Sequence, residues 1–120
     1  MLLDTNIVIY AGQPRYPNIR ALAIAPGVKV SLVSYVEALG WPKITHAERE
    51  RLEDFFIETE VLPVSDAVAD EAVRLRQIRK MEMADALIAA TALVHGQTLV
   101  TRNVADFRWI SGLGLMNPVT

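Results

Sequence analysis

Met1-Leu2-Leu3-Asp4-Thr5-Asn6 is the stretch of sequence that decides the fold. Three apolar residues are followed at once by three polar residues that carry side-chain oxygen, a pattern typical of a short buried strand that ends at a carboxylate. In an open parallel sheet, ligands bind beyond the carboxyl ends of the strands. We therefore expect Asp4 at the functional edge of such a sheet. The alternative is that Asp4 only caps the turn that follows the strand.

Strand-like and helix-like segments alternate along the rest of the chain. The predicted strands after the first are residues 28–32, 61–64, 98–101 and 113–116, and Pro63 indicates a position near a sheet edge. The predicted helices cover 7–11, 19–25, 34–39, a segment opening at Thr45, a segment opening at Ser65, and 84–95, with a turn or short helix over 102–107. This alternation predicts an α/β fold, a three-layer α/β/α sandwich around a mostly parallel sheet of four to five strands. We expect residues 1–120 to form one domain.

Local signals predict where several of these helices begin and end. Ser34-Tyr35-Val36-Glu37 and Thr45-His46-Ala47-Glu48 both have the form of a capping box. Ser65 is the expected N-cap of the next helix, and Gly96 is well placed to terminate the helix over 84–95. A capping box at Ser34 would place Glu37 in the first turn and would occupy its carboxylate with the backbone N–H of Ser34.

Composition excludes several kinds of chemistry. The chain has no cysteine, which removes disulfides, thiolate nucleophiles and cysteine-ligated zinc, and its two histidines, His46 and His95, lie far apart in sequence. The net charge of −2 gives no overall attraction to nucleic acid or to an anionic membrane. A polyanionic ligand must therefore be held by a local basic patch or by a bound metal ion.

Hydropathy gives no indication of a membrane protein. The longest apolar run, residues 84–94, contains Asp85 and is shorter than the roughly 20 residues needed to span a bilayer. The N-terminus has no basic region that would indicate a signal peptide, so a cytoplasmic location is expected. Hydrophobic residues make up 52% of the chain, enough to supply a subunit or partner interface as well as a core.

Four acidic residues occur just beyond predicted strands or at helix starts. They are Asp4, Glu37, Asp85 and Asp106, and the predicted topology brings them to one edge of the sheet. Crowded carboxylates repel one another unless a cation lies among them. Mg²⁺ prefers oxygen ligands and can activate water for phosphodiester hydrolysis. The pattern therefore predicts metal-dependent hydrolysis without a histidine or cysteine.

Each acid also has a plain structural explanation. Asp4 and Asp106 are common turn residues, and Glu37 suits a capping box. Asp85 is harder to explain in this way, because interaction with a helix dipole contributes only about 0.3 to 1 kcal/mol whereas burial of an unpaired carboxylate costs several kcal/mol. The order of the four acids in the chain favours a joint function.

Four segments resemble the acidic motifs of PIN-domain ribonucleases, and the chain length resembles the VapC-type toxins of toxin-antitoxin modules. The segments are residues 2–6, 34–37, 85–92 and 101–107. The resemblance implies that Asp4, Glu37 and Asp85 bind Mg²⁺ or Mn²⁺. It also implies an RNA substrate cut to leave 5′-phosphate and 3′-hydroxyl ends, a cognate antitoxin at the active-site groove, and a homodimer.

The resemblance is incomplete at the fourth acidic position. Asn103 stands where the family aligns an acid, so either Asp106 supplies the charge or a second metal binds only with substrate. The residues expected to support the acids or to contact substrate are Thr5, Asn6, Thr101, Arg102 and Asn103.

Two rival functions follow from particular residues. A phosphatase with Asp4 as nucleophile would need a second acid two residues later, where the chain has Asn6. A PIN-like module that binds RNA or protein but has lost full metal occupancy is motivated by Asn103. The basic residues between Arg74 and Lys80 are interpreted as a solvated helix end, and Trp41 and Phe55-Phe56 as core or interface residues.

Overall fold

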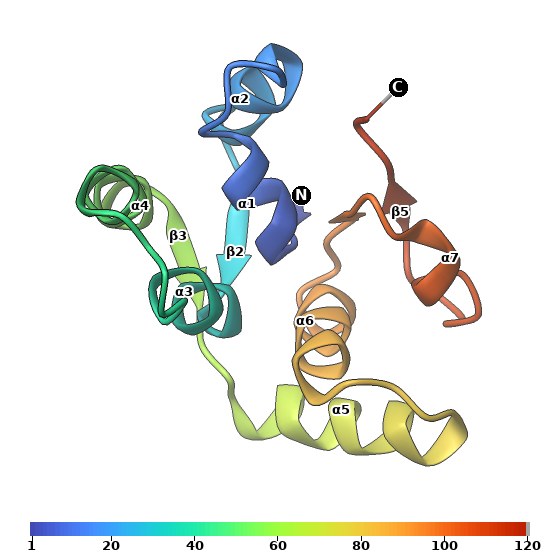
Figure 1. The fold of residues 1–120 in the computed structure, drawn as a ribbon. Helices are drawn as coiled ribbons and strands as arrows, with labels where there is room; N and C mark the ends of the chain where they lie inside the picture. The colour runs from blue at the N-terminus through green and yellow to red at the C-terminus, as the bar shows by residue number, and fades with distance from the viewer. Residues whose placement is uncertain (120) are drawn as a thin grey trace.

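The structure is a computed structural model that describes residues 1–119 (Figure 1). Within this range the chain forms five strands and seven helices. The strands are β1 (Leu2–Leu3), β2 (Lys29–Ser31), β3 (Glu60–Leu62), β4 (Leu99–Val100) and β5 (Leu115–Met116). The helices are α1 (Thr5–Tyr10), α2 (Pro17–Ala23), α3 (Leu32–Leu39), α4 (His46–Glu58), α5 (Asp66–Ile78), α6 (Met83–Val94) and α7 (Val104–Phe107). The one-domain prediction for residues 1–120 stays a prediction.

The five strands form one sheet in the order β3-β2-β1-β4-β5, and every neighbouring pair is parallel. The predicted α/β fold with a parallel sheet is confirmed, and the sheet is wholly rather than mostly parallel. β1 lies at the centre, where Leu3 is in register with Val30 on one side and Val100 on the other. β3 stands at one edge of this order, as Pro63 indicated, and the proline follows directly after the last residue of the strand.

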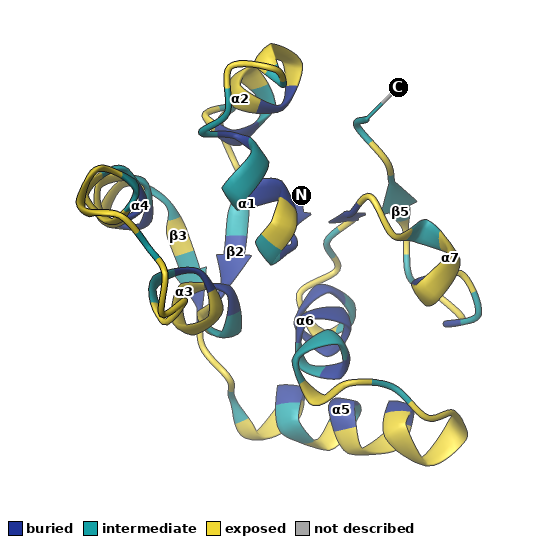
Figure 2. Cartoon of the chain, viewed as in Figure 1, coloured by how far each residue is buried: buried dark blue, intermediate teal, exposed yellow. Residues whose placement is uncertain are grey.

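The sheet separates two hydrophobic cores, which accounts for three layers. Leu2 and Leu99 face a core built mainly from α5 and α6. Leu3, Val30 and Val100 face the other core, which contains residues of α1 to α4. Successive strand residues point to opposite faces, so the two adjacent leucines of β1 serve one core each. In Figure 2, α6 is largely buried, whereas much of α4 and α5 is exposed.

Helix α6 is almost wholly apolar, in keeping with the burial of most of its residues within the domain. Ala86, Ala89, Ala90, Thr91 and Ala92 are all inaccessible to solvent. The Thr91 hydroxyl donates to the backbone carbonyl of Leu87 at 2.7 Å, which satisfies the one buried polar side chain at the centre of this helix. In residues 1–119 no helix combines the length and apolar character needed to cross a bilayer.

The predicted N-caps are confirmed at two of three positions. The Thr45 hydroxyl accepts from the backbone N–H of Glu48 at 3.2 Å and the Glu48 carboxylate accepts from that of Thr45 at 3.1 Å, completing a capping box. Ser65 caps α5 by accepting from Val68 N–H at 3.2 Å. The capping box predicted at Ser34 is wrong, because α3 begins three residues earlier and Ser31 is its N-cap.

Gly96 terminates α6 as predicted, and it does so with a positive φ of 62°. The backbone N–H of Gln97 donates to the carbonyl of Ala92 at 2.8 Å, and that of Gly96 donates to Leu93 at 3.3 Å. These two bonds form a Schellman motif, which requires a left-handed residue between them. The turn then leads directly into β4, whose carboxyl end supplies Thr101.

We expect the Gly96→Ala substitution to lower the free energy of unfolding by about 1 to 2 kcal/mol, because a Cβ is disfavoured in the left-handed region. Gly96→Asn is the matched control and should cost less, since asparagine tolerates this conformation. Urea unfolding followed by circular dichroism measures both values. Equal stability of the alanine variant and the wild type would contradict the assigned turn.

Candidate active site

Asp4 lies directly after β1 and is held in place by neighbours on both sides. Its backbone N–H donates to the carbonyl of Val100 at 3.0 Å, which continues the pairing of β1 with β4. Its Oδ1 atom accepts from the backbone N–H of Ile7 at 3.0 Å, so Asp4 is the N-cap of α1. Asp4 is only 7% exposed. The capping role is therefore real, but it occupies one oxygen of a buried carboxylate and leaves the other for further contacts.

Glu37 lies in the second turn of α3, one turn later than the predicted capping box would place it. Its Oε1 atom accepts from the hydroxyl of Thr5 at 2.6 Å, and the same hydroxyl lies 2.9 Å from Oγ of the buried Ser34. Because Ser31 caps α3, the Glu37 carboxylate is not used for capping. Thr5 thus links the start of α1 to α3 and orients Glu37 next to the residue that follows Asp4.

Asp85 occupies the first turn of α6, as predicted, and is partly buried. Asp106 lies in the short helix α7 and is exposed, and its backbone carbonyl accepts from the indole N–H of Trp109 at 2.9 Å. Asn103 is the residue just before α7, and its backbone N–H donates to the hydroxyl of Thr101 at 3.0 Å. Thr101 is fully buried at the carboxyl end of β4.

Three of the four predicted acids line one small cavity, which we call the acid cavity. It has a volume of about 110 Å³, and its polar walls are Asp4, Thr5, Asn6, Glu37, Asp85 and Asn103. Asp106 lines a neighbouring cavity instead, and Asp85 forms part of both walls. Thr101 and Arg102 line neither cavity, although the side chain of Thr101 is hydrogen-bonded to Asp4.

The surroundings of Asp4 and Asp85 disfavour the charged forms of both carboxylates. Burial raises the pKa of Asp4 above its usual value, and Glu37 raises it further, while hydrogen bonds from Thr101 and the backbone of Ile7 lower it. Burial is also the largest cause of the raised pKa of Asp85, followed by repulsion from Glu37, Asp106 and Asp4. The position of Asp85 at a helix N-terminus favours its charged form, but burial and repulsion outweigh this effect.

The donor set of the acid cavity fits a hard divalent cation. Carboxylate and amide oxygens are the ligands that Mg²⁺ and Mn²⁺ prefer, and Mg²⁺ commonly keeps several waters and takes only one or two carboxylates. As the side chains of residues 1–119 are placed, no three acidic or histidine groups form a set that could hold an ion. The fit is therefore one of donor chemistry and charge, and the acids must adjust to bind a metal directly.

Two arginine side chains, those of Arg15 and Arg102, each lie over a tyrosine ring. The guanidinium of Arg102 lies 5.7 Å from the ring centre of Tyr10, and that of Arg15 lies 5.3 Å from the ring centre of Tyr16. The two tyrosine rings lie 4.9 Å apart. Hydrogen bonding to Tyr10 raises the pKa of Arg102, so its positive charge is secure. Arg102 thus sits beside Asn103 in the chain and is held by Tyr10.

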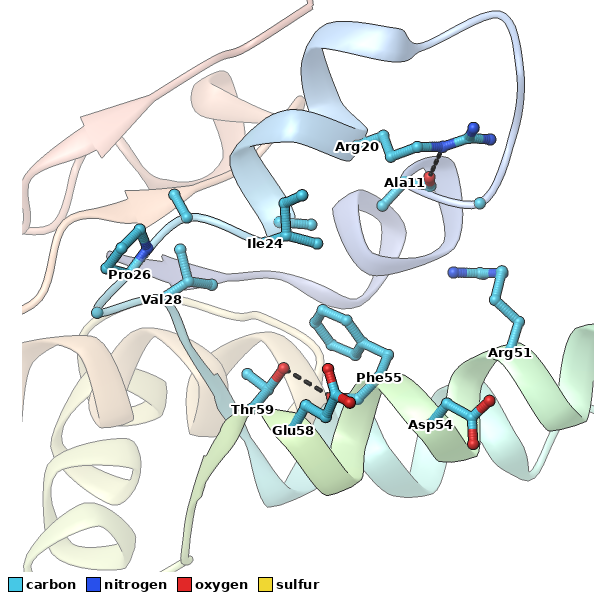
Figure 3. A pocket seen from close by; sticks show the side chains of 14 residues that line it. Ala11, Arg20, Ile24, Pro26, Val28, Arg51, Asp54, Phe55, Glu58 and Thr59 are labelled. Atoms are coloured by element: carbon cyan, nitrogen blue, oxygen red, sulfur yellow. Dashed lines mark hydrogen bonds between the residues drawn. The ribbon is translucent and has the colours of Figure 1, made fainter.

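A larger cavity, about 750 Å³, lies elsewhere, at the edge where β2 and β3 begin (Figure 3). Figure 3 shows Phe55 and Arg51 of α4 on one wall and Arg20 of α2 on another, where Arg20 donates to the carbonyl of Ala11 at 3.2 Å. None of the predicted site residues lines it. Size therefore does not identify the site, whereas the convergence of acids does.

Sequence reasoning missed two features next to the acid cavity. The first is Ser31. The alternating pattern of residues 28–32 placed it inside a predicted strand, so its role as the N-cap of α3 was not predicted. The second is the neighbouring cavity, where Trp109 and three residues of the basic cluster, Arg76, Arg79 and Lys80, stand beside Asp85. The basic residues between Arg74 and Lys80 were visible in the sequence. Nothing in the sequence indicated that they share a cavity with Asp106 and Trp109, because those residues lie more than 20 positions later in the chain.

The chain is similar to known proteins in sequence and in fold. A sequence model of the PIN domain matches residues 1–111. A chain in a toxin-antitoxin complex from Klebsiella pneumoniae is 31% identical, with a TM-score of 0.81 and coverage of 98% of this chain and 97% of that chain. No curated protein sequence matches the chain at a significant level.

Two further solved structures share the fold. A chain of VapBC2 from Rickettsia felis, bound to a DNA fragment from the promoter, is 26% identical with a TM-score of 0.78, over 97% of this chain and 96% of that chain. A chain of VapBC-1 from nontypeable Haemophilus influenzae has a TM-score of 0.77 over 99% of this chain and 98% of that chain. At 24% identity, this last likeness shows the fold alone.

We expect Asp85→Asn to stabilise the metal-free protein at pH 7. The raised pKa of Asp85 means that the folded state binds more protons than the unfolded state between the ordinary pKa of an aspartate, 3.8, and the raised one, so the free energy of unfolding falls as pH rises through this window. The asparagine variant lacks this loss.

Urea unfolding of both proteins in chelator, from pH 4 to pH 7, measures the difference, which should grow with pH. Millimolar Mn²⁺ should reduce it at pH 7, since a cation stabilises the charged form. Parallel pH profiles for the two proteins would contradict the prediction.

Proposed function

The chain belongs to the PIN domain family as a VapC-type toxin, and from this premise we propose that it is a Mg²⁺-dependent endoribonuclease that hydrolyses RNA phosphodiester bonds. The observation that carries the proposal is the acid cavity. Asp4, Glu37 and Asp85 come from three segments that are distant in the chain, and they line one cavity although their charges repel. Such an arrangement is favourable only when a cation shares the site.

Asp4, Glu37 and Asp85 are the residues proposed to hold the ion, with Mn²⁺ as a substitute for Mg²⁺. When bound, the ion neutralises phosphate charge and lowers the pKa of a water molecule for in-line attack. A site of this kind requires neither a histidine nor a cysteine, in keeping with the composition of the chain.

The chain's own residues set the orientation of the acids. The cap of α1 and the Thr101 hydroxyl hold Asp4, and the Thr5 hydroxyl holds Glu37. Asn103 adds an uncharged amide to the wall, which can donate a hydrogen bond to a phosphate oxygen where a fourth carboxylate would repel it. Of the two residues considered for the fourth acidic position, Asn103 shares the acid cavity and Asp106 acts on Asp85 from the next one.

A cognate antitoxin and a second copy of the chain are the proposed protein partners. The first is supported by the toxin-antitoxin and VapBC complexes to which the chain is similar. The second is supported by exposed apolar residues on α5 and α6, among them Val73 and Met83 at 56% and 60% exposure. An RNA substrate implies a cytoplasmic site of action, which stays a prediction.

We expect Asp4→Asn and Asp85→Asn each to reduce RNA cleavage by at least about 100-fold, because each removes a charged oxygen ligand and even residues that only support a ligand contribute 10- to 100-fold. Asp70→Asn is the matched control, since Asp70 is exposed on α5 and lines neither cavity. Cleavage of structured and unstructured RNA in Mg²⁺, in Mn²⁺ and in chelator gives the measurement. Full activity of either site variant, with the fold intact by circular dichroism, would overturn the assignment.

A second candidate function, a PIN-like binding module with weakened metal occupancy, is favoured by one observation. Asn103 places an amide in the acid cavity, and no ready-made set of three ligands exists in residues 1–119. The phosphatase alternative gains no such support, because Asn6 stands on the cavity wall where that chemistry needs a second acid.

Calorimetric titration with Mn²⁺ separates nuclease from module. We expect the wild type to bind Mn²⁺ and Asn103→Asp to bind it about tenfold or more tightly, because a further carboxylate joins the same cavity. Asp106→Asn should change the affinity less, since Asp106 lies on the wall of the neighbouring cavity. Absence of binding to the wild type at millimolar Mn²⁺ would favour the module.

A further inference from the structure

Of the three acids that line the acid cavity, Glu37 is the one that burial does not hold in place. Asp4 is buried and Asp85 is partly buried, whereas Glu37 is exposed. The charge of Glu37 also repels those of Asp4 and Asp85. Exposure and repulsion both favour a side chain that turns away from the cavity into water. The hydrogen bond from the Thr5 hydroxyl, 2.6 Å long, opposes this movement and keeps the carboxylate among the other acids.

A buried serine, Ser34, contacts the same hydroxyl of Thr5. Its side chain is inaccessible to solvent, and its Oγ atom lies 2.9 Å from Oγ1 of Thr5. Thr5 has one hydroxyl proton, and a carboxylate oxygen can only accept, so this proton belongs to the bond with Glu37. The bond between the two hydroxyls is then donated by Ser34. The result is a chain in which Ser34 donates to Thr5 and Thr5 donates to Glu37, and we call it the hydroxyl chain.

The Ser34 hydroxyl serves another element rather than its own helix. The hydroxyls of Thr59, at the end of α4, and Thr91, in α6, donate to the backbone carbonyl four residues earlier. The Ser34 hydroxyl reaches from α3 to the first residue of α1 instead. Alanine has a higher helix propensity than serine and carries no polar group to bury. Helix packing alone therefore gives no reason for a serine at this position, and a local choice of this kind is typical of functional sites.

We propose that Ser34 is a positioning residue of the metal site, which acts through Thr5 to hold the Glu37 carboxylate where an ion binds. This inference rests on the proposed function and extends the site to a residue that does not line the acid cavity. A hydroxyl that accepts a hydrogen bond becomes a better donor, so the bond from Ser34 strengthens the bond from Thr5 to Glu37. Partners outside the ligand set commonly orient metal ligands in this way.

The hydroxyl chain also fixes two of the proposed ligands relative to each other. Thr5 follows Asp4 directly, and Asp4 caps the helix that Thr5 begins. Glu37 lies on α3, three residues after Ser34. A chain between α1 and α3 therefore sets the position of Glu37 relative to Asp4 before an ion arrives. The bond from Thr5 uses Oε1 and leaves Oε2 to bind the ion. A ligand ordered in advance loses less freedom on binding, which raises affinity.

Calorimetric titration of the full chain with Mn²⁺ measures the role of Ser34 without RNA cleavage. We expect Ser34→Ala to bind Mn²⁺ about tenfold less tightly than the wild type. This loss is at the lower end of the range of about 10- to 100-fold for partners of metal ligands, because Ser34 acts through a second residue. Thr5→Ser keeps the hydroxyl and should retain most of the affinity. Equal affinity of Ser34→Ala and the wild type would overturn the proposal.

Ser31→Ala is the matched control on the same helix. Ser31 is as fully buried as Ser34, but its hydroxyl accepts from the backbone N–H of Val33 and caps α3. Loss of this cap should lower the urea concentration at which the metal-free protein unfolds and leave the Mn²⁺ affinity unchanged. Ser34→Ala should unfold no earlier than Ser31→Ala, since alanine suits a buried helix position. Equal losses of Mn²⁺ affinity in the two variants would assign the effect to α3 as a whole and overturn the proposal.

A double-mutant cycle tests whether Ser34 acts through Thr5. Thr5→Val keeps the shape of the side chain, removes the hydroxyl and should weaken Mn²⁺ binding about tenfold or more. Once the hydroxyl chain is broken at Thr5, the addition of Ser34→Ala should change the affinity by less than about twofold. Independent effects would instead multiply to about 100-fold, and this result would overturn the hydroxyl chain. If Ser34→Ala does not fold by circular dichroism, Ser34→Cys takes its place, because a thiol fills the space but is a weak donor.

The outcome is separable from that of the proposed function. If the wild type binds Mn²⁺ and cleaves RNA while Ser34→Ala binds Mn²⁺ equally well, the role of Ser34 is wrong and the nuclease stands. If the wild type binds Mn²⁺ but cleaves no RNA, and the variants lose affinity as stated, Ser34 is a positioning residue of a metal site and the nuclease fails. Absence of Mn²⁺ binding to the wild type would overturn both.

Discussion

The pairing of β1 with a parallel neighbour on each side is the constraint on which the rest of the structure depends. It fixes Leu2 and Leu3 in two opposite cores, and it aligns the ends of β1, β2 and β4 at one edge. Asp4 and Thr101 follow directly after paired strands, and α3 with Glu37 starts where β2 ends. A shift of one residue would reverse the faces of β1 and move Asp4 away from Thr101. The same register that builds the cores therefore builds the acid cavity.

The carboxylates of the acid cavity lower the stability of the fold that positions them. Burial and repulsion raise the pKa of Asp4 and of Asp85, so both charges are unfavourable at neutral pH without a cation. Hydrogen bonds hold two of the three acids in place, from Ile7 and Thr101 to Asp4 and from Thr5 to Glu37. Charged groups kept in such places are typical of functional sites, because structure alone gives no reason to collect them.

The sequence predicted the parts of the site that depend on strand ends and failed where contacts between distant segments decide. Asp4 and Asp85 were placed by an apolar run beside a lone acid, which is a local signal. Glu37 was given the wrong neighbour, because Ser34 and Ser31 are equally good caps in sequence and only the end of β2 at Ser31 selects between them. Trp109 was missed because nothing local indicates that its ring faces the end of α5.

Asp85 connects the two charged cavities, and this position gives it a part in both. Its carboxylate is repelled by Glu37 and Asp4 on one side and by Asp106 on the other, while Arg76 and Arg79 border the second cavity. Under the proposed function, the phosphates of RNA meet carboxylates at this boundary, and a metal on the acid side makes their approach favourable. Binding of substrate and binding of metal should therefore support each other, because the cation reduces the repulsion between phosphate and carboxylates and the phosphate adds to the attraction for the cation.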